Sequence, residues 1–394
     1  MNSVLLDEVR AMQLELTQIR QDIHAHPEMA MEEVRTSALV SAKLKEWNIV
    51  VTEGVGQFGV VGTLKSLRPG NNTIGLRADM DGLRIREEND VPYISTTPGT
   101  MHACGHDGHT AMLLGAAKYL AEHRDSFCGT VHFIFQPAEE KLMGAIAMID
   151  DGLFDRFPMD AVYGLHNYPE KLGTFATRPG PVMAGGDQWV VTFHGTGGHA
   201  GALVHLTADL TVLQAQFILA LQTIISRNIR PVDPAVITVG AIECGSFQSL
   251  NVMPSKLCIG GTTRSLTQSV RNTIQRRMKE IATNLASDFG CQAEVEYTSV
   301  AVPLVNHVEQ TKQAIKAAQA VVGEGNVDQN MEPTLAGEDF SYMLLKRPGS
   351  FIFMGIKDET KFGNLHSSTY DFNDDAIPYG VAYWISLVQQ ELNN

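Results

Sequence analysis

Hydrophobic positions in the first half of the chain follow two alternating periodicities. Short apolar runs predict buried strands at FGVVGTL, NTIGLRAD, GTVHFIFQ and DAVYGLHN. A longer run with helical spacing, HTAMLLGAAKYLAEH, lies between the second and third of these strands. This alternation is typical of a mainly parallel sheet covered by helices, and such sheets bind ligands beyond the carboxyl ends of their strands.

The middle of the chain has a different pattern. Strands and helices are predicted there in the order β-α-β-β-α-β, which is the order of the ferredoxin-like unit. Segments rich in turn formers flank it, and an αβ pattern resumes from about residue 302. We therefore predict an α/β protein whose larger domain, with a central and mostly parallel sheet, comprises residues 1–185 and 302–394. A ferredoxin-like domain of residues 186–301 is inserted into it.

Composition and charge narrow the class of protein. The 394 residues are 44% hydrophobic, which is ample for a packed core. A net charge of −14 opposes binding to nucleic acids and to anionic membrane surfaces. The N-terminal segment has an amphipathic helical pattern instead of a signal peptide, and no apolar run reaches the roughly 18 residues of a membrane span. Five cysteines without a C-x-x-C pair argue against a disulfide framework, so we expect a reduced, cytoplasmic protein.

The segment TMHACGHDGHTAM, residues 100–112, concentrates three histidines, a cysteine and an aspartate. Cys104 and His106 are two residues apart, a spacing that lets both reach one ion from a turn. A thiolate and an imidazole suit zinc, manganese or cobalt. A redox role for Cys104 is the alternative, but it leaves the candidate ligands elsewhere in the chain unexplained.

Further candidate ligands follow other predicted strands or lie near the C-terminus. FQPAEE supplies Glu139 and Glu140, GLHN supplies His166, and NLHSSTYDF supplies His366. A set with both thiolate and carboxylate suits two ions that share a bridge better than one tetrahedral ion. Neighbouring side chains on an extended segment point in opposite directions, so one of the adjacent carboxylates can bind metal while the other takes a proton from water.

Several motifs occur in one order along nearly the whole chain, from IHAHPE at Ile23 to YDFND ending at Asp374. Between them lie MHACGHDGHTAMLLGAAKYL, GTVHFIFQPAEE, VYGLHN, GTGGHAG, LNVMP, AGEDFSYML and LHSSTYDFND. Together they resemble the peptidase M20 family of metallohydrolases. The nearest branch is the amidohydrolase subfamily, which includes hippurate hydrolases, aminoacylases and auxin-conjugate hydrolases.

The resemblance implies a site with two divalent metal ions per subunit, which could be manganese, zinc, cobalt or nickel. The ligand positions of the family are occupied by Cys104, His106, Glu140, His166 and His366. Glu139 stands at the position of the general base. Asp81 stands at the position of a carboxylate that orients a ligand histidine.

The inserted domain resembles the lid and dimerisation domain of the family, which implies a homodimer or a higher homo-oligomer. His199 stands at the position of a histidine that reaches the partner subunit's active site and stabilises the developing oxyanion. Asn251 and Arg264 stand at substrate-anchoring positions. An arginine at such a position can hold a substrate carboxylate through two parallel hydrogen bonds.

The implied activity is hydrolysis of the amide bond of N-acyl amino acids to a carboxylic acid and a free amino acid. Metal-activated water would attack the carbonyl, with Glu139 as general base. Two alternatives stay open: a dipeptidase or carboxypeptidase of the same family, and an inactive metal-binding homologue that acts as a binding protein. The lid loop bears on both, because Gly201, Val204 and Leu210 replace the usual Ala, Pro and Pro and remove restraints on φ.

Overall fold

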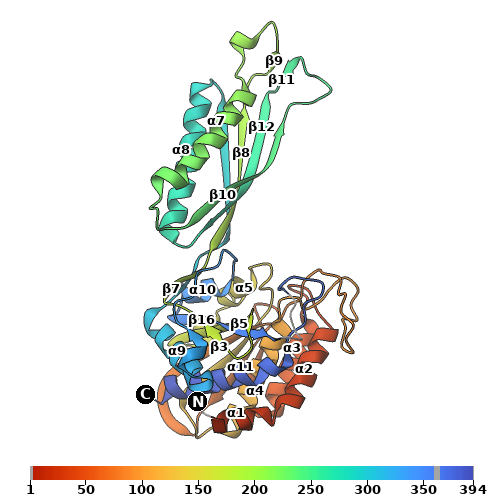
Figure 1. Cartoon of the computed structure of the whole chain (residues 1–394), viewed down its shortest axis with the longest axis vertical. Coiled ribbons are helices and arrows are strands. Elements are labelled where there is room, and N and C mark those ends of the chain that lie inside the picture. Colours follow the sequence, from red (N-terminus) through yellow and green to blue (C-terminus); the bar gives the residue numbers. More distant parts are fainter. Residues whose placement is uncertain (1–2, 359–363, 394) are drawn as a thin grey trace. The chain divides into compact units, whose positions relative to one another are not determined.

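The computed structural model describes residues 3–358 and 364–393. The chain divides into two compact units, and each contains its own sheet (Figure 1). Unit 1 comprises Met1–Val182, Val305–Glu332 and Glu338–Asn394. Unit 2 comprises Met183–Leu304 and Pro333–Gly337. A short segment far along the chain therefore packs with unit 2.

Unit 1 is built on an eight-stranded sheet with the order β1-β2-β4-β3-β5-β16-β6-β15. The strands are β1 (Val50–Val55), β2 (Gly59–Lys65), β3 (Arg68–Asp79), β4 (Cys128–Gln136), β5 (Ala161–Lys171), β6 (Phe175–Ala176), β15 (Val327–Asp328) and β16 (Gly349–Lys357). The central strands β4, β3, β5 and β16 are parallel. Antiparallel pairs join β1 to β2, β2 to β4, and β16 to β6. The sheet is therefore mixed, with a parallel centre.

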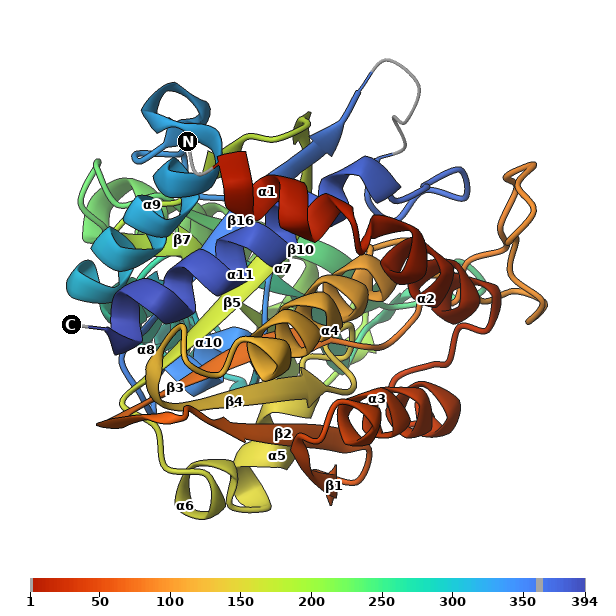
Figure 2. The same ribbon diagram turned by 90° about the horizontal axis from the view of Figure 1, so that it is seen from below.

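Helices cover both faces of this sheet. They are α1 (Ser3–Arg10), α2 (Gln13–Ala25), α3 (Val34–Glu46), α4 (His106–Glu122), α5 (Gly144–Asp150), α6 (Leu153–Arg156), α9 (Val308–Val322), α10 (Phe340–Leu344) and α11 (Ile377–Leu392). Helices α4 and α11 pack against each other and against β3, on the opposite side of the sheet from α5 and α10 (Figure 1). Helices α1, α2 and α9 surround the α4–α11 pair (Figure 2).

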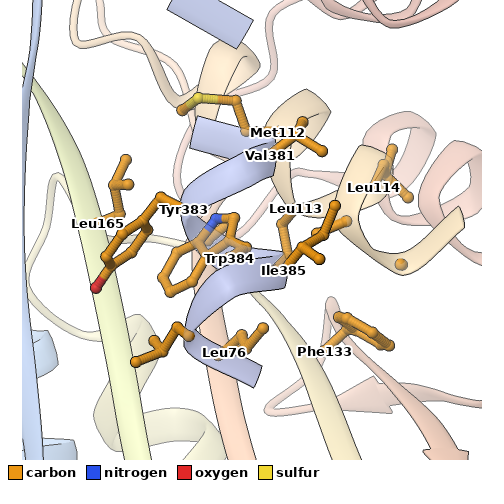
Figure 3. Close-up of a cluster of buried hydrophobic side chains, with 14 of the residues drawn as sticks. Leu76, Met112, Leu113, Leu114, Phe133, Leu165, Val381, Tyr383, Trp384 and Ile385 are labelled. Carbon is orange, nitrogen blue, oxygen red and sulfur yellow. The ribbon is translucent and has the colours of Figure 1, made fainter. Parts of the chain in front are cut away.

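The core between the sheet and the α4–α11 pair is apolar and closely packed. Figure 3 shows its centre, formed by Leu76, Met112, Leu113, Leu114, Phe133, Leu165, Val381, Tyr383, Trp384 and Ile385. Each of these side chains is at most 1% exposed. Burying one large apolar side chain contributes about 1.5–3 kcal/mol, so this cluster fixes α4 firmly on the sheet. The first residue of α4 is His106, a candidate ligand.

Unit 2 contains a four-stranded sheet and two long helices, whose elements follow the order β-α-β-β-α-β. The elements are β8 (Gly185–His194), α7 (Leu210–Thr223), β10 (Ala235–Cys244), β12 (Lys256–Ser265), α8 (Gln268–Asp288) and β13 (Gln292–Ala301). The sheet is antiparallel throughout, with the order β10-β12-β8-β13. Both helices pack on the sheet around Trp189, Phe193 and Phe217. Asp209 and Thr267 cap the two helices by accepting backbone N–H groups.

Short elements complete the two units. They are β7 (Gly180–Met183), β9 (Gly198–His199), β11 (Val252–Met253), β14 (Leu304–Asn306), and the single turns Val204–Leu206, Ile224–Asn228, Glu324–Asn326 and Asp374–Ala376. Strand β9 pairs with β11, and β7 pairs with β14.

Helix α7 and the turn that follows it form an apolar segment that the sequence analysis did not identify as long enough for a membrane. Among the described residues, Leu210–Asn228 is the one helix that could cross a membrane by length and composition. Buried core helices pass the same test. Leu210, Leu213, Phe217 and Leu221 belong to the core of unit 2, so we interpret the segment as a packed helix with an exposed apolar side.

Candidate metal centre

Four separate segments of unit 1 bring their candidate ligands to one place. Because β3, β4 and β5 are parallel, the segments at their carboxyl ends meet at one edge of the sheet. Cys104 and His106 lie at the start of α4, Glu140 follows β4, and His166 lies in β5. His366 comes from the segment after β16, where its backbone N–H donates to the carbonyl of Ala103 at 2.8 Å.

The ligand atoms are within a few ångströms of one another. Cys104 Sγ is 3.4 Å from the Nε2 atoms of both His166 and His366. Glu140 Oε1 is 3.5 Å from His366 Nε2 and 3.9 Å from His106 Nε2. Two ligand groups share Cys104: one adds His106 and His166, and the other adds Glu140 and His366. The five candidate ligands predicted from the sequence therefore form one cluster.

The donor set fits a divalent cation. His106 Nε2 and Glu140 Oε1 are buried and have no hydrogen-bond partner among the described residues. An unsatisfied buried polar atom costs about 1–3 kcal/mol, and a cation between these two atoms would offset that cost. Burial, followed by the charges of Glu140 and Glu139, raises the pKa of the Cys104 thiol well above its usual value. A metal ion reverses this effect, because thiolate is the form that binds metal.

Hydrogen bonds fix the orientation of two candidate ligand histidines. Asp81 Oδ1 is 3.1 Å from His106 Nδ1, so this carboxylate accepts the Nδ1 proton and leaves Nε2 directed at the cluster. His166 Nδ1 donates to the carbonyl oxygen of Asn167 at 2.6 Å. Burial lowers the pKa of His166 well below its usual value, which keeps the imidazole neutral and able to bind metal.

The carboxylate pair lies on a turn. The sequence analysis placed Glu139 and Glu140 on an extended segment, and this was wrong: residues 138–142 form a turn in which Ala138 has a φ of 55°. Asp81 accepts the backbone N–H groups of Glu139 and Glu140 at 3.1 and 3.0 Å. The turn, rather than strand alternation, directs the two carboxylates to different neighbours. Glu140 faces Cys104 and His366, and both carboxylates approach His106.

Glu139 also approaches a group of buried acids that the sequence analysis did not name. Its carboxylate lies within 4.8 Å of those of Glu338 and Asp339. Arg77 donates to both of these acids, at 3.0 and 3.1 Å, and to Asp79 at 2.6 Å. Burial, and then the charges of Glu338 and Asp339, raise the pKa of Glu139 well above its usual value. A carboxylate with a raised pKa is a better proton acceptor, as general-base catalysis requires.

Glu338 and Asp339 belong to AGEDFSYML, a motif that contributed to the family resemblance. The sequence signal was an acidic pair directly before an apolar helix start, but no cationic residue near it in the sequence suggested a partner. Another unassigned group surrounds His109, whose ring nitrogens are each 2.6 Å from an oxygen, one in Asp79 and one in Asn167.

The remaining candidate residues belong to unit 2. His199 lies on β9 with its side chain exposed, and its Nδ1 accepts the N–H groups of Gly201 and Ala202 at 3.1 and 3.3 Å. Asn251 is exposed before β11. Arg264 lies on β12 and donates to the carbonyl of Thr263 at 2.8 Å. These three residues are thus in a different unit from the candidate metal ligands, Glu139 and Asp81.

Thiolate, imidazole and carboxylate ligands beside an additional carboxylate of raised pKa define a metal-dependent hydrolase. The chain matches the Peptidase family M20/M25/M40 over residues 75–390. Hippurate hydrolase of Campylobacter jejuni is 37% identical over 98% of this chain and 99% of that protein. N-acetyl-L-cysteine deacetylase of Bacillus subtilis is 39% identical over 92% of this chain and 85% of that protein.

A solved structure agrees with these relatives. The YXEP protein of Bacillus subtilis, a dinuclear metal binding peptidase from the M20 family, has a TM-score of 0.85 and is 30% identical, covering 98% of this chain and 99% of that one. The chain therefore belongs to the M20 peptidase family, and the protein is a hydrolytic enzyme. The resemblance predicted from the motifs is confirmed.

Proposed function

We propose that the enzyme hydrolyses the amide bond of N-acyl amino acids. The names of two relatives support this class of substrate, because hippurate and N-acetyl-L-cysteine are both N-acyl amino acids. The observation that carries the proposal is the position of Glu139, a buried carboxylate of raised pKa within reach of the ligand cluster. Metal ligands alone would fit a binding protein, whereas an additional proton acceptor fits a hydrolase.

We assign the metal to Cys104, His106, Glu140, His166 and His366, with two ions of manganese, zinc, cobalt or nickel. Such ions would polarise the substrate carbonyl and lower the pKa of the attacking water. Glu139 would accept a proton from that water and return it to the leaving amine. Asp81 keeps the His106 ring in the tautomer that leaves Nε2 free, so that the ligand set is prepared before metal binds.

We assign the roles of lid and dimerisation domain to unit 2, as a ferredoxin-like domain of residues 186–301. In this assignment His199 stabilises the oxyanion in the partner subunit's active site, while Asn251 and Arg264 hold the substrate carboxylate. Strand β10 is an edge strand of its sheet, and unpaired edges favour pairing with another chain. Exposed apolar side chains of unit 2, including Leu219 and Phe247, support a second copy of this chain as the partner. The five cysteines are free thiols, which supports the cytoplasm as the location.

The decisive experiment combines metal analysis with a substrate panel. Purified enzyme is assayed on N-acetyl and N-benzoyl amino acids and on dipeptides, with and without chelator and added manganese, zinc or cobalt. We expect release of free amino acid from the N-acyl substrates, loss with chelator and recovery with metal. Cleavage of dipeptides alone would contradict the proposal and favour a peptidase.

Glu139→Gln tests the assignment of the general base. We expect turnover to fall by at least about 100-fold, the lower end of what a general base contributes, while the metal content is unchanged. Glu32→Gln, an exposed change, is the control. Wild-type turnover in Glu139→Gln would refute the assignment.

A further inference from the structure

The turn that carries Glu139 and Glu140 has an unfavourable backbone. Ala138 and Leu142 have φ values of 55° and 54°, in the left-handed region that residues other than glycine rarely adopt. Such conformations persist only where the surroundings determine them, and they concentrate at functional sites. The groups that hold this turn therefore decide where its carboxylates lie.

Two buried carboxylates hold three consecutive N–H groups of the turn. Asp81 accepts those of Glu139 and Glu140. Glu33 Oε1 accepts the N–H of Ala138 at 2.8 Å, although Glu33 lies 105 residues earlier, directly before helix α3. The same oxygen accepts the N–H of Met31 at 3.1 Å, and Met31 also has a positive φ, of 66°. Glu33 thus links two strained backbone segments through one atom.

Burial of Glu33 is difficult to explain by stability alone. The residue is fully buried, and within residues 3–358 and 364–393 no Lys, Arg or His forms an ion pair with it. Its second oxygen, Oε2, has no hydrogen-bond partner there. Burial, and then the charge of Asp81, raise the pKa of Glu33 to about 7. An acid without a counter-ion costs folding energy in such a place, so its contribution lies in the backbone that it holds.

We propose that Glu33 is a positioning residue of the active site, which fixes the Ala138 N–H and thereby the direction in which the turn presents Glu139 and Glu140. The proposal rests on the roles assigned above to these two carboxylates. Glu33 acts through one acceptor oxygen, so an amide oxygen at the same place can replace the carboxylate. A side chain of the same length without an oxygen cannot.

This distinction defines the test. Glu33→Met retains length and apolar bulk but removes the acceptor, whereas Glu33→Gln retains an acceptor oxygen. Glu32→Met is the matched control, since Glu32 is the exposed neighbour. We expect Glu33→Met to lower kcat on the order of 10–100-fold at saturating metal, because a displacement of about 1 Å in a reacting group has effects of this size. KM should change by less than about threefold, and both Glu33→Gln and Glu32→Met should stay within about threefold of wild type in kcat.

Amide hydrogen exchange supplies a readout that needs no substrate. We expect the peptide covering residues 137–142 to exchange on the order of tenfold faster in Glu33→Met than in wild type or Glu33→Gln, because the Ala138 N–H has lost its acceptor. If Glu33→Met does not fold, Glu33→Ala replaces it in both measurements. If wild type hydrolyses nothing in the substrate panel, the proposed function fails while the exchange experiment still tests Glu33.

Three results would overturn the proposal. The first is wild-type kcat and exchange in Glu33→Met, which would show that the bond to Ala138 positions nothing. The second is an equal loss in Glu33→Gln and Glu33→Met, which would assign the effect to charge instead of the acceptor. The third is a lower melting temperature of Glu33→Met with unchanged kcat, which would make Glu33 a structural residue only.

Discussion

Replacing Asp81 by asparagine should weaken metal binding without removing a ligand. The carboxylate accepts three N–H groups: His106 Nδ1 at 3.1 Å and the backbone of Glu139 and Glu140 at 3.1 and 3.0 Å. Asparagine has the same shape, but one of its two terminal atoms is an NH₂ group that donates. Whichever way the amide turns, at least one buried N–H group then faces another donor.

The expected magnitude follows from that conflict. If the NH₂ group replaces Oδ2, the Glu140 N–H loses its acceptor; if it replaces Oδ1, both His106 and Glu139 lose theirs. Loss of one hydrogen bond to a charged group, with a buried donor left unsatisfied, costs about 1.5–3 kcal/mol. Because about 1.4 kcal/mol corresponds to a factor of ten, metal affinity should fall roughly 10- to 100-fold, which matches the usual effect of removing such a partner.

Competition between the metal-free protein and a chelating dye measures this affinity directly. Asp90→Asn, an exposed change in the same segment, is the control and should stay within about twofold of wild type. Thermal denaturation of the metal-free proteins separates ligand orientation from general destabilisation. If Asp81→Asn binds metal as tightly as wild type and differs only in melting temperature, the hydrogen bond between Asp81 and His106 does not contribute to metal affinity.

Two further perturbations test the surroundings of the metal centre. Gly105→Ala places a β-carbon against Asn167 Oδ1 and Tyr370 Oη, at a backbone φ of 90°. We expect this change to lower the free energy of unfolding, measured by urea denaturation, by about 2–5 kcal/mol and to cause loss of bound metal. A variant that keeps its metal and its stability would contradict this. Burial opposes protonation of His24, but hydrogen bonds to Asp107 and Glu87 outweigh it and raise the pKa of His24 to about 9. Since the folded pKa is raised, this contribution to stability is complete below about pH 6.5 and is lost as the pH rises to about 9. The melting temperature of the metal-free wild type should therefore fall more steeply across that range than that of His24→Gln, and parallel curves would refute the assignment.

The clustering of the candidate metal ligands could be predicted from sequence because their segments are marked locally. Cys104 and His106 stand in a segment whose composition is unusual, while Glu140 and His166 follow apolar runs that read as strands. Parallel strands end at a common edge, so a correct reading of the strands was sufficient to predict that these residues meet. The parallel centre of the sheet follows from the same periodicity.

The parts that could not be predicted depend on contacts between distant segments. Glu33 and Ala138 are 105 residues apart, and Arg77 and Glu338 are 261 residues apart, and no local pattern marks either pair. The turn at Ala138 was misread as extended because its positive φ occurs in a residue that gives no signal for it, unlike glycine. The antiparallel pairing of the edge strands depends on which strand lies beside each of them. The periodicity of apolar residues within one strand does not specify that neighbour.

The candidate ligands of the metal centre are encoded on both sides of the segment that forms unit 2. Cys104, His106, Glu140 and His166 precede it, and His366 follows it, near the end of the chain. During synthesis on the ribosome, the first four ligands therefore emerge long before the fifth. A chain that stops before His366 therefore contains four of the five candidate ligands but cannot form the complete cluster.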